Sequence, residues 1–386
     1  MTKFMKPGHS ESYDLMGAAA TRDALSDAAI DFKDIQLAQV GFVLGDPGCA
    51  QQTIYQVGVT GIPITNVSNA CATGATALYL AYQAIKSGMV DCVLALGFEQ
   101  MQVGALGFSG YDDRPVVIGQ HIKKLERFGI DLMQMSSPLF PVFDLAGEEY
   151  AKRYGLKSDT YARVTVKARQ NAMNNPNAIF HELVTAEQVL ASKNVYGSLT
   201  KLQCCPPTSG AAAAVLMSED FARKRGANTS VELAAISLRS DGPSSFAGDS
   251  MIDLAGFDIA RTGAQEVYET SGLGPEDIDV AEINDNFSCA EIITYDALGF
   301  CPEGGGEKFL LDGDSSHGGK IMVNPSGGMM GKGHPLGASG VAQCAELTWQ
   351  LRGQADKRQV EGARIGLQQN LGFVSAGVVG LYKKHS

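Results

Sequence analysis

A cysteine in the first quarter of the chain occupies a position that suits a nucleophile. Cys71 follows a predicted strand, Ile64–Ser68, and precedes a predicted helix over residues 74–87. The unpaired amides and the macrodipole of a helix N-terminus favour a negative charge, and therefore a thiolate. The alternative is a structural cysteine packed beneath the helix.

A histidine stands at a second predicted helix start. His334 directly precedes Pro335, a residue that the first turn of a helix tolerates, and a predicted helix over residues 337–351 follows. Because a helix N-terminus disfavours imidazolium, His334 is expected to be neutral and able to accept a thiol proton. On this interpretation His334 is the general base of the nucleophile Cys71, and a structural or surface histidine is the alternative.

An internal repeat links the two positions. Residues 34–40, DIQLAQV, match residues 277–283, DIDVAEI, and both 71–76 and 334–339 follow the pattern x-x-x-Gly-Ala-Ser/Thr. Two copies of one βαβ-rich unit are implied, related by a pseudo-twofold axis. Such an axis would bring the two helix starts together, and Cys71 would then lie beside His334.

A polar cluster follows the repeated strand of the second half. Asn284, Asp285 and Asn286 stand at its carboxyl end, where α/β sheets build their sites, and Asn284 there can position a water or donate to an oxyanion. An ordinary Asx turn is the alternative. Cys289 falls in the first turn of the next helix. Gly372, between two apolar strands, could direct its amide toward the same centre.

Composition excludes several classes of function. The 386 residues include 31 Lys and Arg against 42 Asp and Glu, a formal net charge of −11, so we expect neither a nucleic-acid nor a membrane partner. No apolar run approaches the roughly 18 residues of a membrane span. The eight cysteines lack Cys-x-x-Cys spacing, which predicts a reducing compartment, the cytoplasm, and no metal site.

Strands and helices alternate along the chain and predict an α/β fold of two duplicated halves, 1–225 and 226–386. A segment of about 102–208 has no counterpart in the second half and is interpreted as an inserted lid domain. The second half opens with a strand-like segment, Val231–Ile236, whose partner would lie before Met1. We therefore expect the first strand of the first half to be missing.

Taken together, these features resemble the thiolase superfamily, and most closely the sterol-carrier-protein type of thiolase. The resemblance covers essentially the whole chain and rests on the segments Asn69–Gly74, Leu202–Pro206, Asn324–Gly328, Gly333–Ala338 and Glu346–Val360. It implies a five-layered αβαβα fold, a coenzyme A thioester as substrate with no bound cofactor, and a homodimer or homotetramer. It also implies that Cys71 takes an acyl group, that His334 activates Cys71 and helps to bind the thioester oxygen, and that the amides of Cys71 and Gly372 hold an oxyanion.

The chain departs from this family at the second acid/base cysteine. Sterol-carrier-type thiolases carry His-Asp-Cys-Phe where this chain has Asn284-Asp285-Asn286-Phe287, and Asn370 stands where other thiolases place that cysteine. Asn284 resembles the water-holding asparagine of ordinary thiolases. Because an amide cannot remove an α-proton at neutral pH, we expect acylation of Cys71 to be intact and the Claisen step to be altered or impaired.

Three functions remain open at this point. The first is an acyl-CoA C-acyltransferase that uses a surrogate base near Asn286, for which Cys289, Asp285 and His334 are the candidates. The second is retro-aldol cleavage of a side-chain acyl-CoA, with a small accessory protein. The third is a non-catalytic scaffold that binds acyl-CoA. The intact nucleophile and base favour the first.

Overall fold

The first half of the chain forms a four-stranded sheet. The computed structural model describes residues 1–102, 119–131, 137–373 and 376–385. The sheet has the order β2-β1-β3-β6, in which β1 is parallel to β2 and β3, and β6 is antiparallel to β3. Its elements are α1 (Tyr13–Ala28), β1 (Leu37–Gly41), α2 (Cys49–Tyr55), β2 (Ile64–Val67), α3 (Thr73–Lys86), β3 (Cys92–Glu99) and β6 (Gly210–Met217).

The second half repeats this arrangement with one more strand. Its sheet has the order β7-β11-β10-β8-β9, with β8, β9 and β10 parallel and β11 antiparallel to both of its neighbours. Its main elements are β7 (Val231–Arg239), α11 (Phe257–Ser271), β8 (Val280–Glu282), α12 (Ser288–Ala297), β9 (Met322–Val323), α15 (Ser339–Arg352), β10 (Ile365–Gly372) and β11 (Ala376–Lys384). Shorter helices are α8 (Glu219–Arg225), α9 (Pro243–Ala247), α10 (Met251–Leu254), α13 (Gly306–Leu311) and α14 (Gly328–Gly331).

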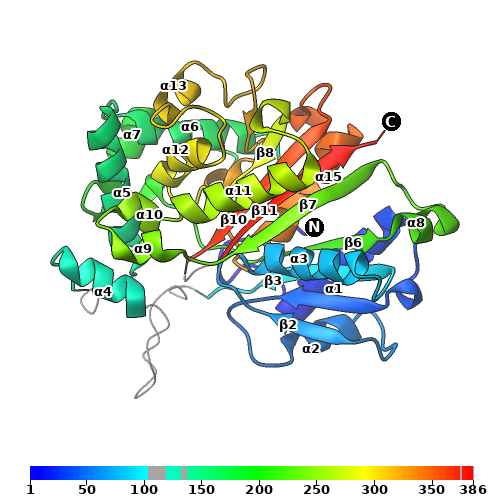
Figure 1. The fold of residues 1–386 in the computed structure, drawn as a ribbon. Helices are drawn as coiled ribbons and strands as arrows, with labels where there is room; N and C mark the ends of the chain where they lie inside the picture. Colours follow the sequence, from blue (N-terminus) through cyan, green and yellow to red (C-terminus); the bar gives the residue numbers. More distant parts are fainter. Residues whose placement is uncertain (103–118, 132–136, 374–375, 386) are drawn as a thin grey trace.

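Five layers result from the packing of these elements. Helix α1 covers the outer face of the first sheet, α3 and α15 lie between the two sheets, and α11 covers the outer face of the second (Figure 1). The central hydrophobic cluster draws side chains from both sheets and from both central helices, among them Leu78, Val93, Val341 and Val378. The predicted αβαβα architecture of two duplicated halves is thus confirmed.

The two central helices cross in direct backbone contact. A Cβ atom added to Gly74 would lie 2.4 Å from the carbonyl oxygen of Gly337, and one added to Gly340 would lie 2.2 Å from the amide nitrogen of Ala75. Only glycine fits at either position. This crossing brings the N-terminal ends of α3 and α15 close together, one from each half of the chain.

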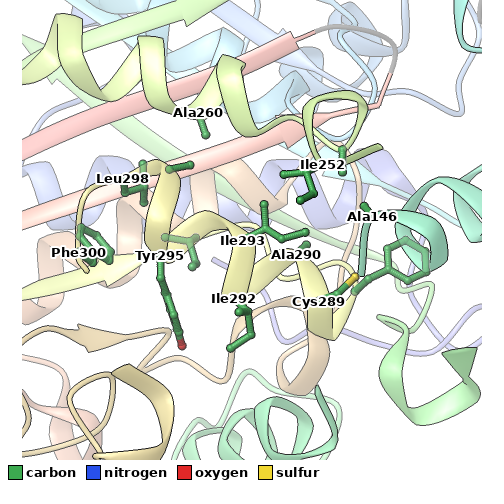
Figure 2. Packing of buried hydrophobic residues seen from close by; sticks show 14 of the residues in the cluster. Ala146, Ile252, Ala260, Cys289, Ala290, Ile292, Ile293, Tyr295, Leu298 and Phe300 are labelled. Carbon is green, nitrogen blue, oxygen red and sulfur yellow. The ribbon is translucent and has the colours of Figure 1, made fainter. Parts of the chain in front are cut away.

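The predicted lid segment contributes helices that pack on the second half. It contains α4 (Gly119–Arg127), α5 (Leu139–Tyr154), α6 (Thr160–Ala172) and α7 (Ala186–Leu190), with the hairpin β4 (Asn194–Tyr196) and β5 (Leu199–Thr200). Residues 103–118 and 132–136 of this segment lie outside the described residues. Helices α5, α6 and α11 pack against α12, every residue of which is buried. Figure 2 shows side chains of α12, including Ile292 and Ile293, within this cluster.

The outer edge of β6 carries short pairings with the beginning of the chain. The amide of Thr2 donates to the Ala211 carbonyl at 2.9 Å, and Met5 and Ser209 exchange hydrogen bonds of 2.9 and 2.8 Å. In the second half, β7 pairs along the equivalent edge of β11. The additional strand expected from the repeat stays a prediction. Among the described helices, none combines the length and apolar character needed to cross a membrane.

Candidate active site

A strained turn presents Cys71 at the start of α3. Ala70 has a positive φ of 48°, a conformation that residues with a side chain seldom adopt. The Thr73 hydroxyl holds the turn closed, since it accepts from the Asn69 amide at 2.7 Å and donates to the Ala70 carbonyl at 2.6 Å. The sequence therefore fixes the backbone on both sides of the cysteine before any substrate binds.

Cys71 is a buried thiol rather than a thiolate in the resting site. Its side chain is 8% exposed and belongs to a small cluster with Val43, Met101 and Leu336. Burial, followed by the negative charge of Glu99, raises the pKa of Cys71 to about 12, and a hydrogen bond from the Phe373 amide opposes that shift. The effect of the helix terminus, on which the sequence argument relied, is outweighed by desolvation.

Gly372 lies directly against the Cys71 turn. A Cβ atom at this position would stand 2.2 Å from the carbonyl oxygen of Asn69 and 2.9 Å from the amide nitrogen of Ala72. The last residue of β10 can therefore approach the nucleophile only because it is glycine. The following residue is Phe373, whose amide reaches the thiol, so this end of β10 supplies a backbone donor to the site.

His334 is held in one tautomer by Ser339, the first residue of α15. Its Nδ1 lies 2.8 Å from the Ser339 hydroxyl, which donates its single hydrogen to the Pro335 carbonyl at 2.9 Å. The hydroxyl must then accept from Nδ1–H, which leaves the lone pair of Nε2 available. Nε2 is buried and has no hydrogen-bond partner among the described residues. Burial, and then the charge of Lys332, lowers the pKa of His334 to about 3, so the imidazole is neutral.

The loop that leads to His334 is anchored by an acidic residue at the end of β8. Glu282 accepts from the amide and the hydroxyl of Ser326 at 3.0 and 2.7 Å, and it forms a buried ion pair of 3.4 Å with Lys332. This glycine-rich segment therefore follows a fixed path and delivers the histidine to the start of α15.

Asp285 anchors the same loop. Its two carboxylate oxygens face the amides of Met329 and Met330 at 2.6 and 3.3 Å, at the start of α14. The side chain is fully buried, and burial together with the nearby charge of Glu291 raises its pKa to about 8. These contacts direct the carboxyl group toward α14.

Cys289 lies in the hydrophobic cluster around α12. Its thiol donates to the Phe143 carbonyl at 3.2 Å, and its Cβ atom lies close to Gly147 of α5. Figure 2 shows its sulfur beside Ala146 and Ala290. Burial raises the pKa of this thiol to a value outside the physiological range. Cys289 thus contacts the lid helix α5.

Several buried side chains near the two helix starts leave polar atoms without partners among the described residues. Among them are His334, Asn284, Asn370 and Thr208, and in both asparagines the two side-chain amide atoms are unpaired. Side chains alternate along β10, so Asn370 shares the face of Gln368, which bonds to Gly340 of α15, and of Gly372. An unpaired buried amide costs about 1–3 kcal/mol, which a bound water or substrate would offset.

Asn286 is placed differently from Asn284. Its side-chain oxygen accepts from the amide of the next residue, Phe287, at 3.1 Å, and its carbonyl accepts from the amide of Cys205 at 2.8 Å. The backbone amide of Asn284, by contrast, donates to the side-chain oxygen of Gln369 at 2.9 Å. The polar cluster after β8 is therefore divided between the loop anchored by Asp285, the strand β10 and the segment that contains Cys205.

Sequence reasoning did not identify Glu99 as part of this region. Its carboxylate accepts from the amides of Val43, Leu44 and Gly337 at 3.1, 2.9 and 3.0 Å. It thereby ties the end of β3 to the residue three positions after His334. Burial raises the pKa of Glu99 to about 7. The sequence feature that could have identified Glu99 is its position as a carboxylate at the end of the otherwise apolar strand β3.

The structure thus brings Cys71, His334 and Gly372 to the junction of the two halves. Leu336, two residues beyond His334, packs in the same cluster as Cys71. The arrangement offers a thiol, a neutral base with a free lone pair, and backbone donors, which are the groups required for acyl transfer. In the part of the chain that the structure describes, no group of three or more His, Cys, Asp and Glu side chains could hold a metal ion.

The chain belongs to the thiolase family. The family model "Thiolase, N-terminal domain" matches residues 1–220, and "Thiolase C-terminal domain-like" matches residues 244–381. Human sterol carrier protein 2 is 48% identical over 389 residues, which cover 99% of this chain and 70% of that protein.

A bacterial relative and a solved structure extend the comparison. Benzoylsuccinyl-CoA thiolase subunit BbsB of Thauera aromatica is 35% identical over 93% of this chain and 89% of its own. Among solved structures, the Ltp2-ChsH2(DUF35) aldolase superposes with a TM-score of 0.80 at 22% identity, over 100% of this chain and 96% of that chain. At that identity the likeness concerns the fold alone.

Proposed function

We propose that this protein is an acyl-CoA C-acyltransferase that forms an acyl-enzyme on Cys71, with a non-standard thiolysis or Claisen step. The observation that carries the proposal is the unpartnered Nε2 of His334, held as a proton acceptor by Ser339 and delivered to the helix start that lies against α3. A merely structural histidine would use both ring nitrogens, because a buried unpaired nitrogen is costly.

In the proposed acylation step, His334 Nε2 takes the proton of Cys71 as the sulfur attacks the thioester carbonyl. The bond to coenzyme A then breaks, and coenzyme A leaves as a thiol with the proton from His334. Because the thiol and the imidazole are both neutral at rest, proton transfer accompanies the attack. The oxyanion receives hydrogen bonds from the backbone amides at the Cys71 turn and at Gly372. A second oxyanion site uses His334 with a water held by Asn284, whose amide atoms lack partners among the described residues.

Assembly and location are proposed from the resemblance to the family. We propose a homodimer or homotetramer in the cytoplasm that acts on an acyl-CoA without a bound cofactor. The aldolase of known structure has a name that joins two proteins, Ltp2 and ChsH2, and the bacterial relative is named as a subunit. Both names support an additional small accessory protein as a partner of this chain.

Mass spectrometry of the intact protein tests the proposal. After mixing with acetyl-CoA, the protein is expected to gain one acetyl group that hydroxylamine removes, and peptide mapping is expected to assign it to Cys71. This hydroxylamine-sensitive adduct is expected to disappear in Cys71→Ser and to persist in Cys344→Ser. Cys344 is a matched control because it is also buried but lies within α15, away from the helix start.

Two outcomes would replace the proposal. Binding of coenzyme A without any adduct would indicate the scaffold. Cleavage of a β-hydroxyacyl-CoA that continues in Cys71→Ala would indicate a retro-aldolase, because that reaction requires no acyl-cysteine. Together with the adduct measurement, these two outcomes separate the three functions.

A further inference from the structure

The proposed reaction requires a second proton carrier. When a β-ketoacyl-CoA is cleaved, the departing α-carbon must receive a proton, and the incoming CoA thiol must lose one. His334 already receives the Cys71 proton. Two of the surrogates suggested by the sequence have other contacts, since the Cys289 thiol donates to Phe143 and the Asp285 oxygens face the amides of α14.

The segment Cys204–Ser209 precedes β6. It contacts the region of Asn286 at one end and His334 at the other. The Cys205 amide donates to the Asn286 carbonyl at 2.8 Å, and Cys204 forms a β-bridge with Phe287. Two residues further on, Pro207 forms a β-bridge with His334. The Cys205 backbone therefore lies beside Asn286, the position at which the related thiolases carry their second acid/base cysteine. Cys205 is also two residues before Pro207, which pairs with the base His334.

The same segment also reaches the surroundings of Cys71. The Ser209 hydroxyl accepts from the amide of Met101 at 2.9 Å, and Met101 packs against Cys71. Gly333, which precedes His334, approaches the Thr208 side chain so closely that a Cβ atom would lie 2.9 Å from it. One short segment thus contacts the environments of Cys71, His334 and Asn286.

The two adjacent cysteines point in different directions. Cys204 has extended backbone angles, and its thiol contacts the Thr200 carbonyl at 3.5 Å in the hydrophobic cluster of the second half. In an extended segment, consecutive side chains point to opposite sides. The Cys205 side chain therefore points away from that cluster. It is also partly accessible to solvent, whereas Cys289 is buried.

We propose that Cys205 is the second acid/base of the reaction and takes the place of the missing cysteine at position 286. This inference rests on the proposed acyl-enzyme. In the cleavage direction, Cys71 attacks the β-carbonyl, the bond between the α-carbon and that carbonyl breaks, and the electron pair of the bond passes to the α-carbon. The Cys205 thiol protonates this carbon and releases acetyl-CoA. The Cys205 thiolate then takes the proton of the next CoA thiol, whose sulfur attacks the acyl group. Cys71 leaves the acyl group and takes back its proton from His334.

The charges around Cys205 suit this cycle. Burial raises the pKa of Cys205 well above its ordinary value, and electrostatic interaction with Cys71, Cys204 and Asp285 raises it further. Cys205 is therefore a protonated acid at neutral pH. Once it has lost its proton, it is a strong base toward the CoA thiol. Buried unpaired amides at Asn284 and Asn370 indicate that the region is built to receive a polar ligand.

A pair of adjacent substitutions tests this role. Cys205→Ser is expected to retain acetylation of Cys71 by acetyl-CoA but to lose about 10²- to 10⁴-fold in the thiolysis of acetoacetyl-CoA, the typical loss on removal of a general acid/base. Exchange of the acetyl-CoA methyl protons for deuterium is expected to fall by the same factor. The matched control, Cys204→Ser, removes the neighbouring thiol that faces the hydrophobic cluster and is expected to leave both rates unchanged.

The outcomes separate this inference from the acyl-enzyme itself. Absence of an adduct on Cys71 in the unaltered protein would refute the proposed function and the role of Cys205 together. An adduct accompanied by undiminished thiolysis in Cys205→Ser would refute Cys205 alone. Should the variant fail to fold, iodoacetamide labelling of the unaltered protein decides, because acetyl-CoA is expected to protect Cys205. Equal labelling with and without acetyl-CoA would overturn the inference.

Discussion

Removal of the Ser339 hydroxyl is expected to slow acylation of Cys71 without direct contact with the substrate. Ser339 accepts the Nδ1–H of His334 and donates to the Pro335 carbonyl, and both bonds are buried. In Ser339→Ala, the His334 Nδ1–H loses its partner. The ring can then move its proton to Nε2, where it can no longer accept one from Cys71.

The magnitude follows from the cost of the unpaired donor. A buried donor without a partner costs about 1–3 kcal/mol, and that energy now favours the unproductive tautomer or a rotated ring. At about 1.36 kcal/mol per tenfold change, acylation is expected to slow by about 5- to 150-fold. Ser339→Thr keeps the hydroxyl and is expected to restore most of the rate, although threonine is a slightly poorer helix former.

Quenched-flow mass spectrometry measures the rate of acetylation of Cys71 in the three proteins, and thermal unfolding is recorded alongside. Ser339 acts here as a positioning residue, so the acetylation rate must fall in protein that is still folded. A lower melting temperature together with an unchanged acetylation rate would refute the reasoning, because it would reduce Ser339 to a structural role.

Three further predictions concern the same site. Because burial lowers the pKa of His334 to about 3, below its ordinary 6.5, the base stays neutral in mild acid. The acylation rate is therefore expected to stay constant from pH 6 down to pH 5, below the range in which Glu99 titrates with its pKa of about 7; a fall of the rate in this interval would contradict the prediction. Asn286→Cys is expected to raise the rate of thiolysis in the unaltered protein and to restore part of that rate in Cys205→Ser. The reason is that it adds a thiol to the residue whose carbonyl accepts from the Cys205 amide, and unchanged rates would speak against a missing acid/base. Gly372→Ala is expected to abolish the adduct on Cys71, because the added Cβ would lie 2.2 Å from the Asn69 carbonyl oxygen and displace the turn that carries Cys71. Acylation at the normal rate would rule out this close approach.

Regular elements were predictable where one residue pattern dominates. Small residues are frequent in the sequence over 74–87 and 337–351, which is typical of closely packed helices, and α3 and α15 begin within two residues of the predicted starts. The apolar run Val40–Leu44 has the pattern of a buried strand, but the strand in the structure is Leu37–Gly41. The reason is Glu99, whose carboxylate takes the amides of Val43 and Leu44 in place of a neighbouring strand. A side chain 55 residues away cannot be read from local periodicity.

The site could be predicted only in its duplicated parts. The repeat identified the helix starts of Cys71 and His334, because the same pattern occurs twice in one chain. Cys205 has no such signal, since its relevance comes from a single backbone bond to Asn286. The protonation state of Cys71 was also out of reach, because desolvation depends on neighbours such as Met101 and Leu336 that come from distant segments.

The glycine contact between α3 and α15 has a consequence for how such a chain can change over time. Where two helices touch through their backbones, neither can rotate or shift unless the other follows, so the halves are coupled in their evolution as well as in their geometry. A larger residue at Gly74 or Gly340 would separate the helix starts even if every catalytic side chain were retained. Loss of activity in a descendant of this protein could therefore begin at a position that carries no chemistry.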